Sequence, residues 1–215
     1  MYLKELEPEL REPEPGEEVD AHTSQKRRGG FVIYTVHSAP SLHSLPHKSR
    51  DLSTNPWASL TFWWKPVERQ VRVEGRMQKV SQAQTQRYFD TRVRGSRIGA
   101  WSSLQSEVLY PNSTADRTRE PGAINVKDVE TAPDEDDGRA GLEARVRENE
   151  ERFKDTDQIP VPPFWGGLRL IPERLEFWQG RETRLHDRFR YERVAKQGVE
   201  DEVDGWEWRI ERLSP

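Results

Sequence analysis

The sequence predicts a mainly β domain, an antiparallel barrel or sandwich with a few helices packed beside it. Several short segments are rich in β-branched and aromatic residues and show the period-two alternation typical of strands. They do not alternate regularly with helices as the strands of a parallel βαβ fold do. Eight tryptophans in 215 residues also indicate a core or a binding site built from large rings.

The length fits one domain with extra segments. Hydrophobic residues make up 33% of the chain and charged residues another 33%, a thin apolar fraction for a fully compact domain. We therefore expect a partly disordered N-terminal segment over 1–30 and a main domain over 31–215. Within that domain, residues 110–138 are polar, contain Pro and Gly and show no period, so we expect a disordered insertion there.

Composition excludes several classes of protein. The net charge is −4, with 34 basic residues spread among 38 acidic ones, which argues against a nucleic-acid partner. Only the basic patch "QKRRGG" suggests an RNA-associated protein. The chain has no cysteine, so disulfides and thiolate metal sites are excluded. It has neither a long apolar run nor a signal-peptide core, and we expect a cytoplasmic protein without membrane contact.

The first half of the chain contains three predicted strands. "GFVIYTV" at 30–36 and "ASLTFWW" at 58–64 are rich in β-branched and aromatic residues. "RQVRVEGRMQKV" at 69–80 alternates valine with charged residues, and Gly75 within it predicts a β-bulge. A short helix is expected near 49–53.

Helical segments follow. "SQAQTQRYFDTR" at 81–92 has Ser81 and Gln84 at the spacing of a capping box. "GSRIGAWSSLQSEVL" at 95–109 predicts a short helix and then a turn. "RAGLEARVRENEERF" at 139–153 predicts an exposed amphipathic helix, with its apolar residues on or near one face.

The last third predicts a hairpin and a final strand. "GGLRLI" at 166–171 and "RLEFWQG" at 174–180 flank the dipeptide "PE", which we interpret as the turn. "WEWRIERL" at 206–213 alternates almost strictly. The stretch "RLHDRF" at 184–189, taken alone, is typical of a solvated charge run.

Common motifs of catalysis are absent. The chain has no G-x-G-x-x-G, no phosphate-binding P-loop and no G-x-S-x-G elbow. His37, His43 and His47 lie close in sequence, but partners for a metal are not identifiable. We interpret the three histidines as solvated and expect no metal site.

One constellation points to an anion. Tyr88, Arg92 and Ser96 are spaced so that a single helix would present them along one face. A guanidinium with two hydroxyl groups suits a phosphate. An exposed polar helix face would have the same spacing, and spacing alone leaves both interpretations open.

Four blocks of sequence carry a family likeness: "NPWASLTFWWKPVERQVRVEGRMQKV", "YFDTRVRGSRIGAWSSLQS", "PVPPFWGGLRLIPERLEFWQGRETRLHDRFRYER" and the ending "WRIERLSP". Together they resemble the pyridoxamine 5'-phosphate oxidase family over 31–109 and 142–215. The resemblance implies an FMN-binding split β-barrel that forms a homodimer with FMN at the subunit interface. It also implies oxidation of pyridoxamine or pyridoxine 5'-phosphate to pyridoxal 5'-phosphate, with dioxygen as the electron acceptor and hydrogen peroxide as the product.

The resemblance also assigns roles to individual residues. The substrate would be bound by Lys4, Tyr88, Arg92, Ser96, Arg184 and His186, the last two lying over its ring as the catalytic pair. FMN would be bound by Tyr34, Thr35, Lys48, Gln70, Gln105, Ser106, Trp178 and Arg188. Asp187 would be a structural partner of a neighbouring cation.

The chain departs from the family pattern near its start. The family has a strand and an R-x-V-L-L-K motif where this sequence has "MYLKEL", so the first strand of the barrel is expected to be missing. His47 replaces an arginine that grips the FMN phosphate, and polar insertions are expected near 7–28 and 110–138. These departures keep a second interpretation open, a non-catalytic module that binds FMN or pyridoxal phosphate.

Overall fold

The computed structural model describes residues 5–6, 10–11, 27–37, 46–107, 109, 139–198 and 205–215. The predicted insertion at 110–138, most of segment 1–30, Lys4 and His43 lie outside the described residues. No helix among those described is long and apolar enough to cross a membrane.

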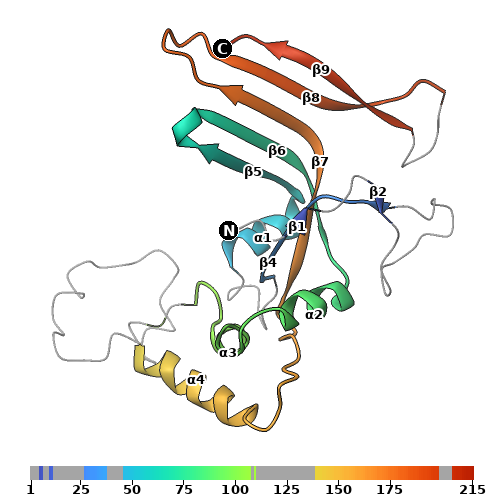
Figure 1. Ribbon diagram of the computed structural model, residues 1–215. Coiled ribbons are helices and arrows are strands. Elements are labelled where there is room, and N and C mark those ends of the chain that lie inside the picture. Colours follow the sequence, from blue (N-terminus) through green and yellow to red (C-terminus); the bar gives the residue numbers. More distant parts are fainter. Residues whose placement is uncertain are drawn as a thin grey trace.

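A curved antiparallel sheet forms the body of the described chain (Figure 1). Its seven strands are β1 (Glu5–Leu6), β4 (Phe31–Val36), β5 (Trp57–Trp64), β6 (Arg69–Lys79), β7 (Trp165–Gln179), β8 (Asp187–Ala195) and β9 (Trp206–Leu213). The strand order is β1-β4-β7-β6-β5, with β8 paired to β7 and β9 paired to β8. A separate two-stranded sheet pairs β2 (Leu10–Arg11) with β3 (Arg27–Arg28). The predicted mainly β class is confirmed.

Strand β7 organises this sheet. Its first half pairs with β4, so that Trp165 lies opposite Val36, and its second half pairs with β8, so that Gln179 lies opposite Asp187. Strand β6 runs along the other edge of β7 over nearly its whole length. The two ends of β7 therefore support different parts of the molecule.

The predicted hairpin turn at 172–173 is wrong, because the chain continues through it as one strand. The register between β6 and β7 shifts between Glu74 and Gly75, and Gly75 then pairs with Pro172. A proline cannot donate to the ladder and is tolerated at such an irregularity. A Cβ at Gly75 would lie 1.8 Å from the Ile171 carbonyl oxygen, so glycine allows this close approach. The predicted bulge at Gly75 is confirmed.

Strand β8 was not predicted. Its sequence is dominated by charged residues, and a solvated loop would have the same composition. In the structure these charges are matched across the strands: Arg190 contacts Glu211, and Glu192 contacts Arg209 at 2.8 Å and Arg174 at 2.8 Å. Cross-strand ion pairs thus replace the apolar alternation by which a strand is usually recognised.

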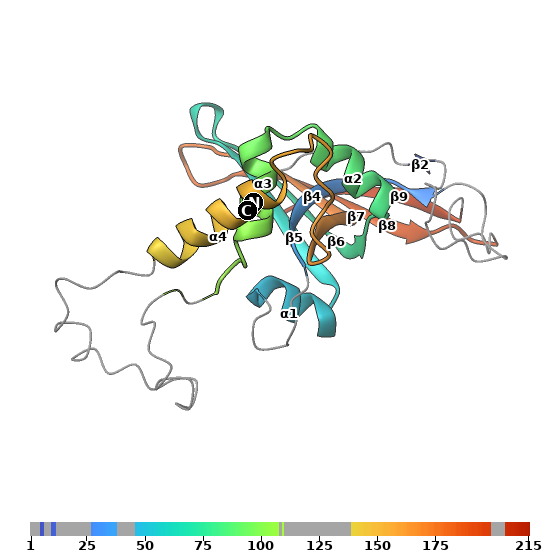
Figure 2. The ribbon, with the colours of Figure 1, turned by 90° about the horizontal axis from the view of Figure 1, so that it is seen from below.

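Four α-helices flank the sheet in the described part of the chain: α1 (His47–Thr54), α2 (Gln82–Asp90), α3 (Arg94–Ser102) and α4 (Arg139–Arg152). A short 3-10 turn, η2 (Lys65–Val67), joins β5 to β6. The Ser81 side chain accepts a hydrogen bond from the Gln84 backbone N–H at 3.1 Å, which confirms the predicted cap of α2. Helices α2, α3 and α4 gather where β7 begins, whereas β8 and β9 lie at its other end (Figures 1 and 2).

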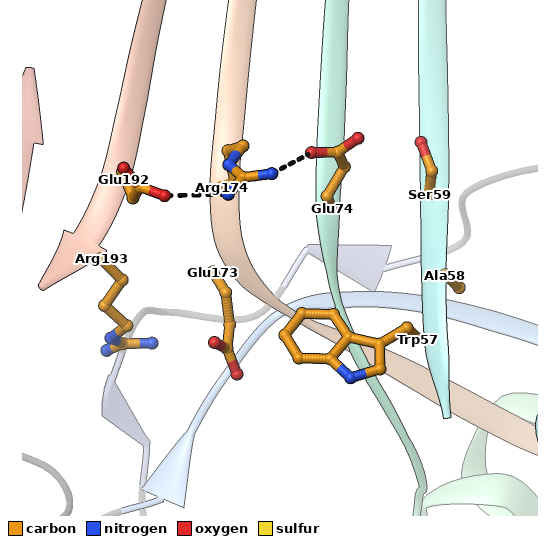
Figure 3. A pocket seen from close by; sticks show the side chains of 8 residues that line it. All are labelled: Trp57, Ala58, Ser59, Glu74, Glu173, Arg174, Glu192 and Arg193. Carbon is orange, nitrogen blue, oxygen red and sulfur yellow. Dashed lines mark hydrogen bonds and ion pairs between the residues drawn. The ribbon is translucent and has the colours of Figure 1, made fainter. Parts of the chain in front are cut away.

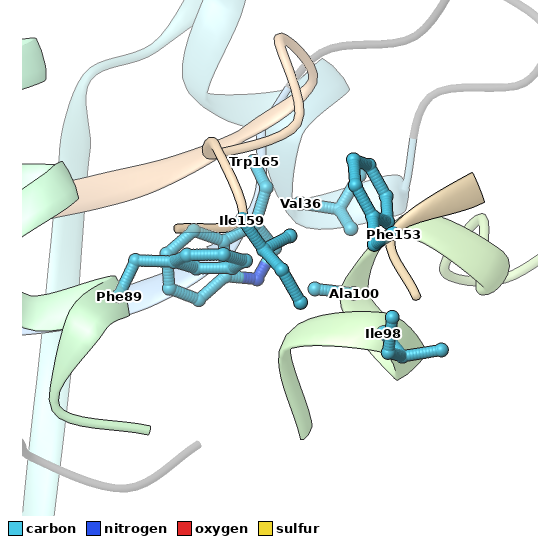
Figure 4. Close-up of a cluster of buried hydrophobic side chains, with 7 residues drawn as sticks. All are labelled: Val36, Phe89, Ile98, Ala100, Phe153, Ile159 and Trp165. Carbon is cyan, nitrogen blue, oxygen red and sulfur yellow. The ribbon is translucent and has the colours of Figure 1, made fainter. Parts of the chain in front are cut away.

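A hydrophobic cluster fills the space between these helices and the start of β7 (Figure 4). It consists of Val36, Phe89, Ile98, Ala100, Phe153, Ile159 and Trp165. The Trp165 ring meets Phe89 edge-on, with centroids 5.2 Å apart, and Phe89 is fully buried. Burial of such large rings stabilises this end of the sheet and fixes the helices that carry the first part of the site.

Candidate functional site

A polar pocket of about 400 Å³ lies where α2, α3 and the start of β7 meet. It is lined by Tyr34, Tyr88, Thr91, Arg92, Val93, Ser96 and Trp165. The three residues predicted to bind a phosphate therefore do come together. Sequence reasoning missed Thr91, Val93 and Trp165, none of which belongs to a motif that would single it out.

The single helix face that the spacing suggested for the three phosphate residues does not form, because they are divided between two helices and their connection. Helix α2 ends at Asp90 and α3 begins at Arg94, because the backbone of Val93 is extended. Tyr88 thus stands in the last turn of α2, Arg92 in the connection, and Ser96 in the first turn of α3. The corner between the two helices, and not a helix face, brings the side chains to one pocket.

Arg92 is half-buried in this pocket, among aromatic rings. Its guanidinium carbon lies 5.0 Å from the centroid of the Trp165 ring and 5.7 Å from that of Phe89. Its Nη1 atom is buried and has no hydrogen-bond partner among the described residues. Burial lowers the pKa of Arg92 from its ordinary value, the sign of a cation held out of water. A phosphate would give this Nη1 atom an acceptor and the guanidinium a counter-charge.

Stacked tyrosines form one wall of this pocket. The rings of Tyr34 and Tyr88 are nearly parallel, with centroids 3.9 Å apart, and Tyr34 also stacks on Trp165 at 5.7 Å. A Cβ at Gly167 would lie 2.8 Å from the Tyr34 ring, so glycine there lets the ring lie against the strand. Tyr34 thus lines the predicted substrate pocket, although it was predicted to contact FMN.

A second cluster joins Thr35, Lys48 and Gln105. The Thr35 hydroxyl donates to the Gln105 side-chain oxygen at 3.0 Å, and the Lys48 ammonium donates to the same oxygen. Burial lowers the pKa of Lys48. Ser106 follows in a turn with a left-handed φ of 68°. Successive strand residues point to opposite faces, so this cluster lies across β4 from the pocket that contains Tyr34.

A third cluster lies on strands β6, β7 and β8. Gln70 pairs in register with Trp178, and Trp178 pairs with Arg188, so the three side chains share one face of the sheet. The Trp178 ring lies 4.7 Å from the ring of His186. A cavity of about 680 Å³ opens at the same strands, but it lies mainly on the opposite face, where Val71, Phe177 and Phe189 pair in register. Aromatic side chains that the sequence did not single out complete it: Trp64, Phe177 and Phe189.

The turn that precedes β8 presents the predicted catalytic pair. The Arg181 backbone N–H donates to Nδ1 of His186 at 3.1 Å. Arg184 is exposed and has a left-handed φ of 62°. Asp187 accepts hydrogen bonds from the Arg181 guanidinium at 2.5 and 2.7 Å and from Arg212. The expected structural role of Asp187 is confirmed, and the Arg181 hydrogen bonds hold the pKa of this carboxyl below its usual range.

The first two clusters and the third lie at opposite ends of β7, because Tyr34 and Thr35 pair with its start and Arg188 with its end. Trp165 belongs to the phosphate pocket and Trp178 to the third cluster. At about 3.3 Å per residue, the strand between them measures on the order of 40 Å before its curvature is considered. One chain therefore does not bring Arg92 and His186 to the same small molecule.

The predicted histidines behave differently from one another. His47 is exposed, as predicted, and its Nδ1 lies 3.0 Å from an Arg50 nitrogen. His37 contradicts the prediction of a solvated side chain, because its ring packs against Gly166 and its Nδ1 is buried. Burial and then the nearby Lys79 lower the pKa of His37.

A further cavity of about 460 Å³ lies near the bulge (Figure 3). Arg174 forms ion pairs there with Glu192 at 2.8 Å and Glu74 at 3.4 Å, and Trp57 forms part of the opposite wall. None of the predicted site residues lines this cavity, and we assign no ligand to it.

Comparison with solved structures supports the predicted split β-barrel. The crystal structure of PhzG from Burkholderia lata, in complex with tetrahydrophenazine-1-carboxylic acid, superposes with a TM-score of 0.58 at 23% sequence identity. The match covers 87% of this chain and 69% of that protein. Identity this low establishes a shared fold only.

Sequence comparison shows the family. Residues 40–132 match the pyridoxamine 5'-phosphate oxidase model, and residues 165–215 match the pyridoxine 5'-phosphate oxidase C-terminal dimerisation region. Pyridoxamine 5'-phosphate oxidase of Saccharomyces cerevisiae is 39% identical over 86% of this chain and 64% of its own length. Pyridoxine/pyridoxamine 5'-phosphate oxidase of Bordetella pertussis is 43% identical over 86% of this chain and 67% of its own length. The chain belongs to the pyridoxamine 5'-phosphate oxidase family.

The chain is shorter than these relatives. It spans 64% of the Saccharomyces protein and 58% of a probable pyridoxamine 5'-phosphate oxidase of Schizosaccharomyces pombe, to which it is 43% identical.

Proposed function

We propose that the protein oxidises pyridoxamine 5'-phosphate or pyridoxine 5'-phosphate to pyridoxal 5'-phosphate with FMN as its cofactor and dioxygen as the final electron acceptor. The observation that carries this proposal is the corner between α2 and α3. It presents a buried, unsatisfied Arg92 nitrogen together with the Tyr88 and Ser96 side chains in one polar pocket. A phosphate monoester on an aromatic ring fits that pocket, and membership of the family supports the same substrate class.

The residues present also fit FMN. The Lys48 ammonium and the Thr35 hydroxyl, which already converge on Gln105, are donors of the kind that bind a phosphate. The sheet face that Gln70 shares with Trp178 offers an amide edge and an indole ring to a flat ring system. Lys4 remains part of the proposed substrate set, as the resemblance implies. Bound to these residues, FMN would supply the hydride acceptor for the substrate and the means of reducing dioxygen to hydrogen peroxide.

The protein's own residues would hold the substrate for that transfer. Arg92 fixes the phosphate end through charge-assisted hydrogen bonds, which positions the ring. Arg184 and His186 would lie over the ring near the reacting carbon and supply hydrogen bonds and positive charge. His186 offers Nε2–H, because its Nδ1 already accepts the Arg181 N–H.

We propose that a second copy of the chain completes the site. The phosphate pocket and the turn with His186 lie at opposite ends of β7, so both can act on one substrate only if two chains pack in opposite directions. An isologous dimer with two-fold symmetry does this and creates two equal sites. The match of residues 165–215 to the family's dimerisation region supports a homodimer.

Complementation between two inactive variants tests both the proposed oxidase activity and the proposed sharing of each site between two chains. Arg92→Ala and Arg184→Ala are purified with different tags, and each is expected to have lost turnover of pyridoxine 5'-phosphate. Co-expressed, they should form mixed dimers in which one of the two sites is intact. Random pairing then restores about a quarter of wild-type turnover.

The control is a mixture of Arg92→Ala with Ser96→Ala, whose defects lie in the same pocket. It should regain nothing, because no mixed dimer has an intact phosphate pocket. Recovery in the control, or none in the first mixture, would contradict a site shared between chains.

The alternative is a module that binds FMN or pyridoxal phosphate without catalysis. The exposed His47, at the position of a family arginine that grips FMN, is the observation that favours it. The visible spectrum of the purified protein and aldehyde formation from pyridoxine 5'-phosphate separate the two functions. A yellow, FMN-loaded protein without turnover would establish the alternative, and a protein that takes up neither added FMN nor added pyridoxal phosphate would contradict both.

A further inference from the structure

We propose that Glu176 is a positioning residue of the flavin site. Its buried carboxylate holds Arg188 in one orientation and offsets one of the two positive charges that Arg72 and Arg188 bring to this face. The inference rests on the proposed function, because it concerns how Arg188 meets FMN.

The carboxylate of Glu176 is enclosed and fully engaged. Its side chain is only 8% exposed, although it stands in the middle of a sheet face rich in charge. Arg188 donates to it through Nε at 2.8 Å and through Nη2 at 3.2 Å. Arg72 donates from the neighbouring strand at 2.9 Å. The hydrogen bonds from Arg188 are the main reason that the pKa of Glu176 is lowered.

These contacts fix the Arg188 side chain from two sides. Its Nη1 atom donates to the Ser214 backbone oxygen at 2.9 Å, which ties it to the end of β9. A guanidinium has five N–H groups, so these three bonds leave about two for a ligand. Arg188 is therefore better suited to hydrogen-bond a polar edge of the flavin ring than to neutralise the FMN phosphate. The Lys48 ammonium is better suited to the phosphate.

The charge of the group follows from its members. Glu176 offsets one of the two guanidinium charges near Trp178, which stands two residues further along β7, and Glu74 forms a longer ion pair with Arg72 at 3.4 Å. A positive charge near a flavin favours its reduced, anionic form, so the carboxylate moderates how readily the cofactor is reduced. Glu176→Gln keeps the shape and a hydrogen-bond acceptor but adds one net positive charge. Arg72→Gln removes one.

The two substitutions should change the FMN midpoint potential in opposite directions. Glu176→Gln should shift it to more positive values and weaken FMN binding by about tenfold, because an amide oxygen is a poorer partner for Arg188 than a carboxylate. Arg72→Gln should shift it to more negative values. The full-length protein is titrated with FMN by flavin fluorescence, and its potential is measured by dye-coupled reduction.

Glu192→Gln is the matched control. Glu192 lies on β8 and is paired with Arg174 and Arg209, away from Trp178, so neither FMN affinity nor potential should change. If Glu176→Gln does not fold, the midpoint potential of Arg72→Gln still tests the inference. A shift to more negative values supports it, and a shift to more positive values overturns it. The inference is overturned if the potential stays at the wild-type value in the variants that bind FMN, or if the wild-type protein binds no FMN. Loss of turnover with intact FMN binding would instead contradict only the proposed oxidase function.

Discussion

The backbone N–H of Arg181 donates a hydrogen bond to Nδ1 of His186 over 3.1 Å. A neutral imidazole that accepts at Nδ1 carries its proton on Nε2. The ion pair between Arg181 and Asp187 restrains the same turn, in which Arg184 adopts a left-handed φ. The turn thus presents His186 as a hydrogen-bond donor beside Trp178, and we expect this donor to interact with the substrate.

Replacing His186 by glutamine or by asparagine distinguishes the roles of its two ring nitrogens. The amide nitrogen of Gln reaches the place of Nε2, whereas Asn reaches only the place of Nδ1. His186→Gln should therefore keep part of wild-type kcat, and His186→Asn should lose on the order of a hundredfold, the contribution of one well-placed donor. Steady-state kinetics with pyridoxine 5'-phosphate measure this. Equal losses in both variants would show that Nε2–H donation is not the role of His186.

Arg92 should govern affinity for the phosphate group. Arg92→Gln removes a buried cation with an unsatisfied N–H, so KM for pyridoxine 5'-phosphate should rise by about tenfold to a hundredfold. Binding of unphosphorylated pyridoxine, measured by calorimetry, should hardly change. Arg87→Gln, at an exposed position on α2, is the control and should behave as wild type. A similar loss for both ligands would place Arg92 in a structural role.

Two glycines should respond oppositely to alanine. A Cβ at Gly75 would lie 1.8 Å from a backbone oxygen of β7, and backbone cannot move aside cheaply. Gly75→Ala should lower the free energy of unfolding by about 2 kcal/mol or more, as strained packing does. Gly99 stands within α3 with nothing within 4 Å, so Gly99→Ala should raise it by about 0.5–1 kcal/mol. Urea denaturation of both variants checks the contrast.

Sequence reasoning was most successful where local chemistry decides the structure. The Ser81 cap, the bulge at Gly75 and the apolar strand β4 each follow from the preferences of their own residues. It was wrong at Pro172, because a proline normally ends a strand and only the partner strand shows that a bulge accommodates it. Strand β8 was missed for a related reason, since its charges are satisfied by residues far away in sequence.

In the candidate site, too, the features set by local sequence were predicted and those set by distant partners were not. Tyr88, Arg92 and Ser96 were expected together and are together, and the predicted helical segments 81–92 and 95–109 do correspond to two helices, although the spacing argument treated the three residues as one helix face. The role of Glu176 was invisible, because a glutamate in a strand is ordinarily a solvent-facing residue. Its burial follows from two arginines that neighbouring strands bring to it.

Glu176 should also make stability depend on pH. Its pKa is lowered in the folded protein, chiefly by the Arg188 hydrogen bonds, from an ordinary value of 4.5. The unfolded chain therefore binds a proton more readily than the folded chain. The stabilisation from the ionised carboxylate is complete above pH 4.5 and is lost as the pH falls through the lower, folded-state pKa.

Glu176→Gln removes this titration. The loss in free energy of unfolding between about pH 7 and pH 3, measured by urea denaturation, should be smaller in the variant than in the wild type. Glu143→Gln, which breaks an exposed pair with Arg139 on α4, is the control and should leave the pH dependence nearly unchanged, because such surface pairs contribute little. If Glu176→Gln and the wild type lose equal stability on acidification, the carboxylate is not held ionised by its two arginines.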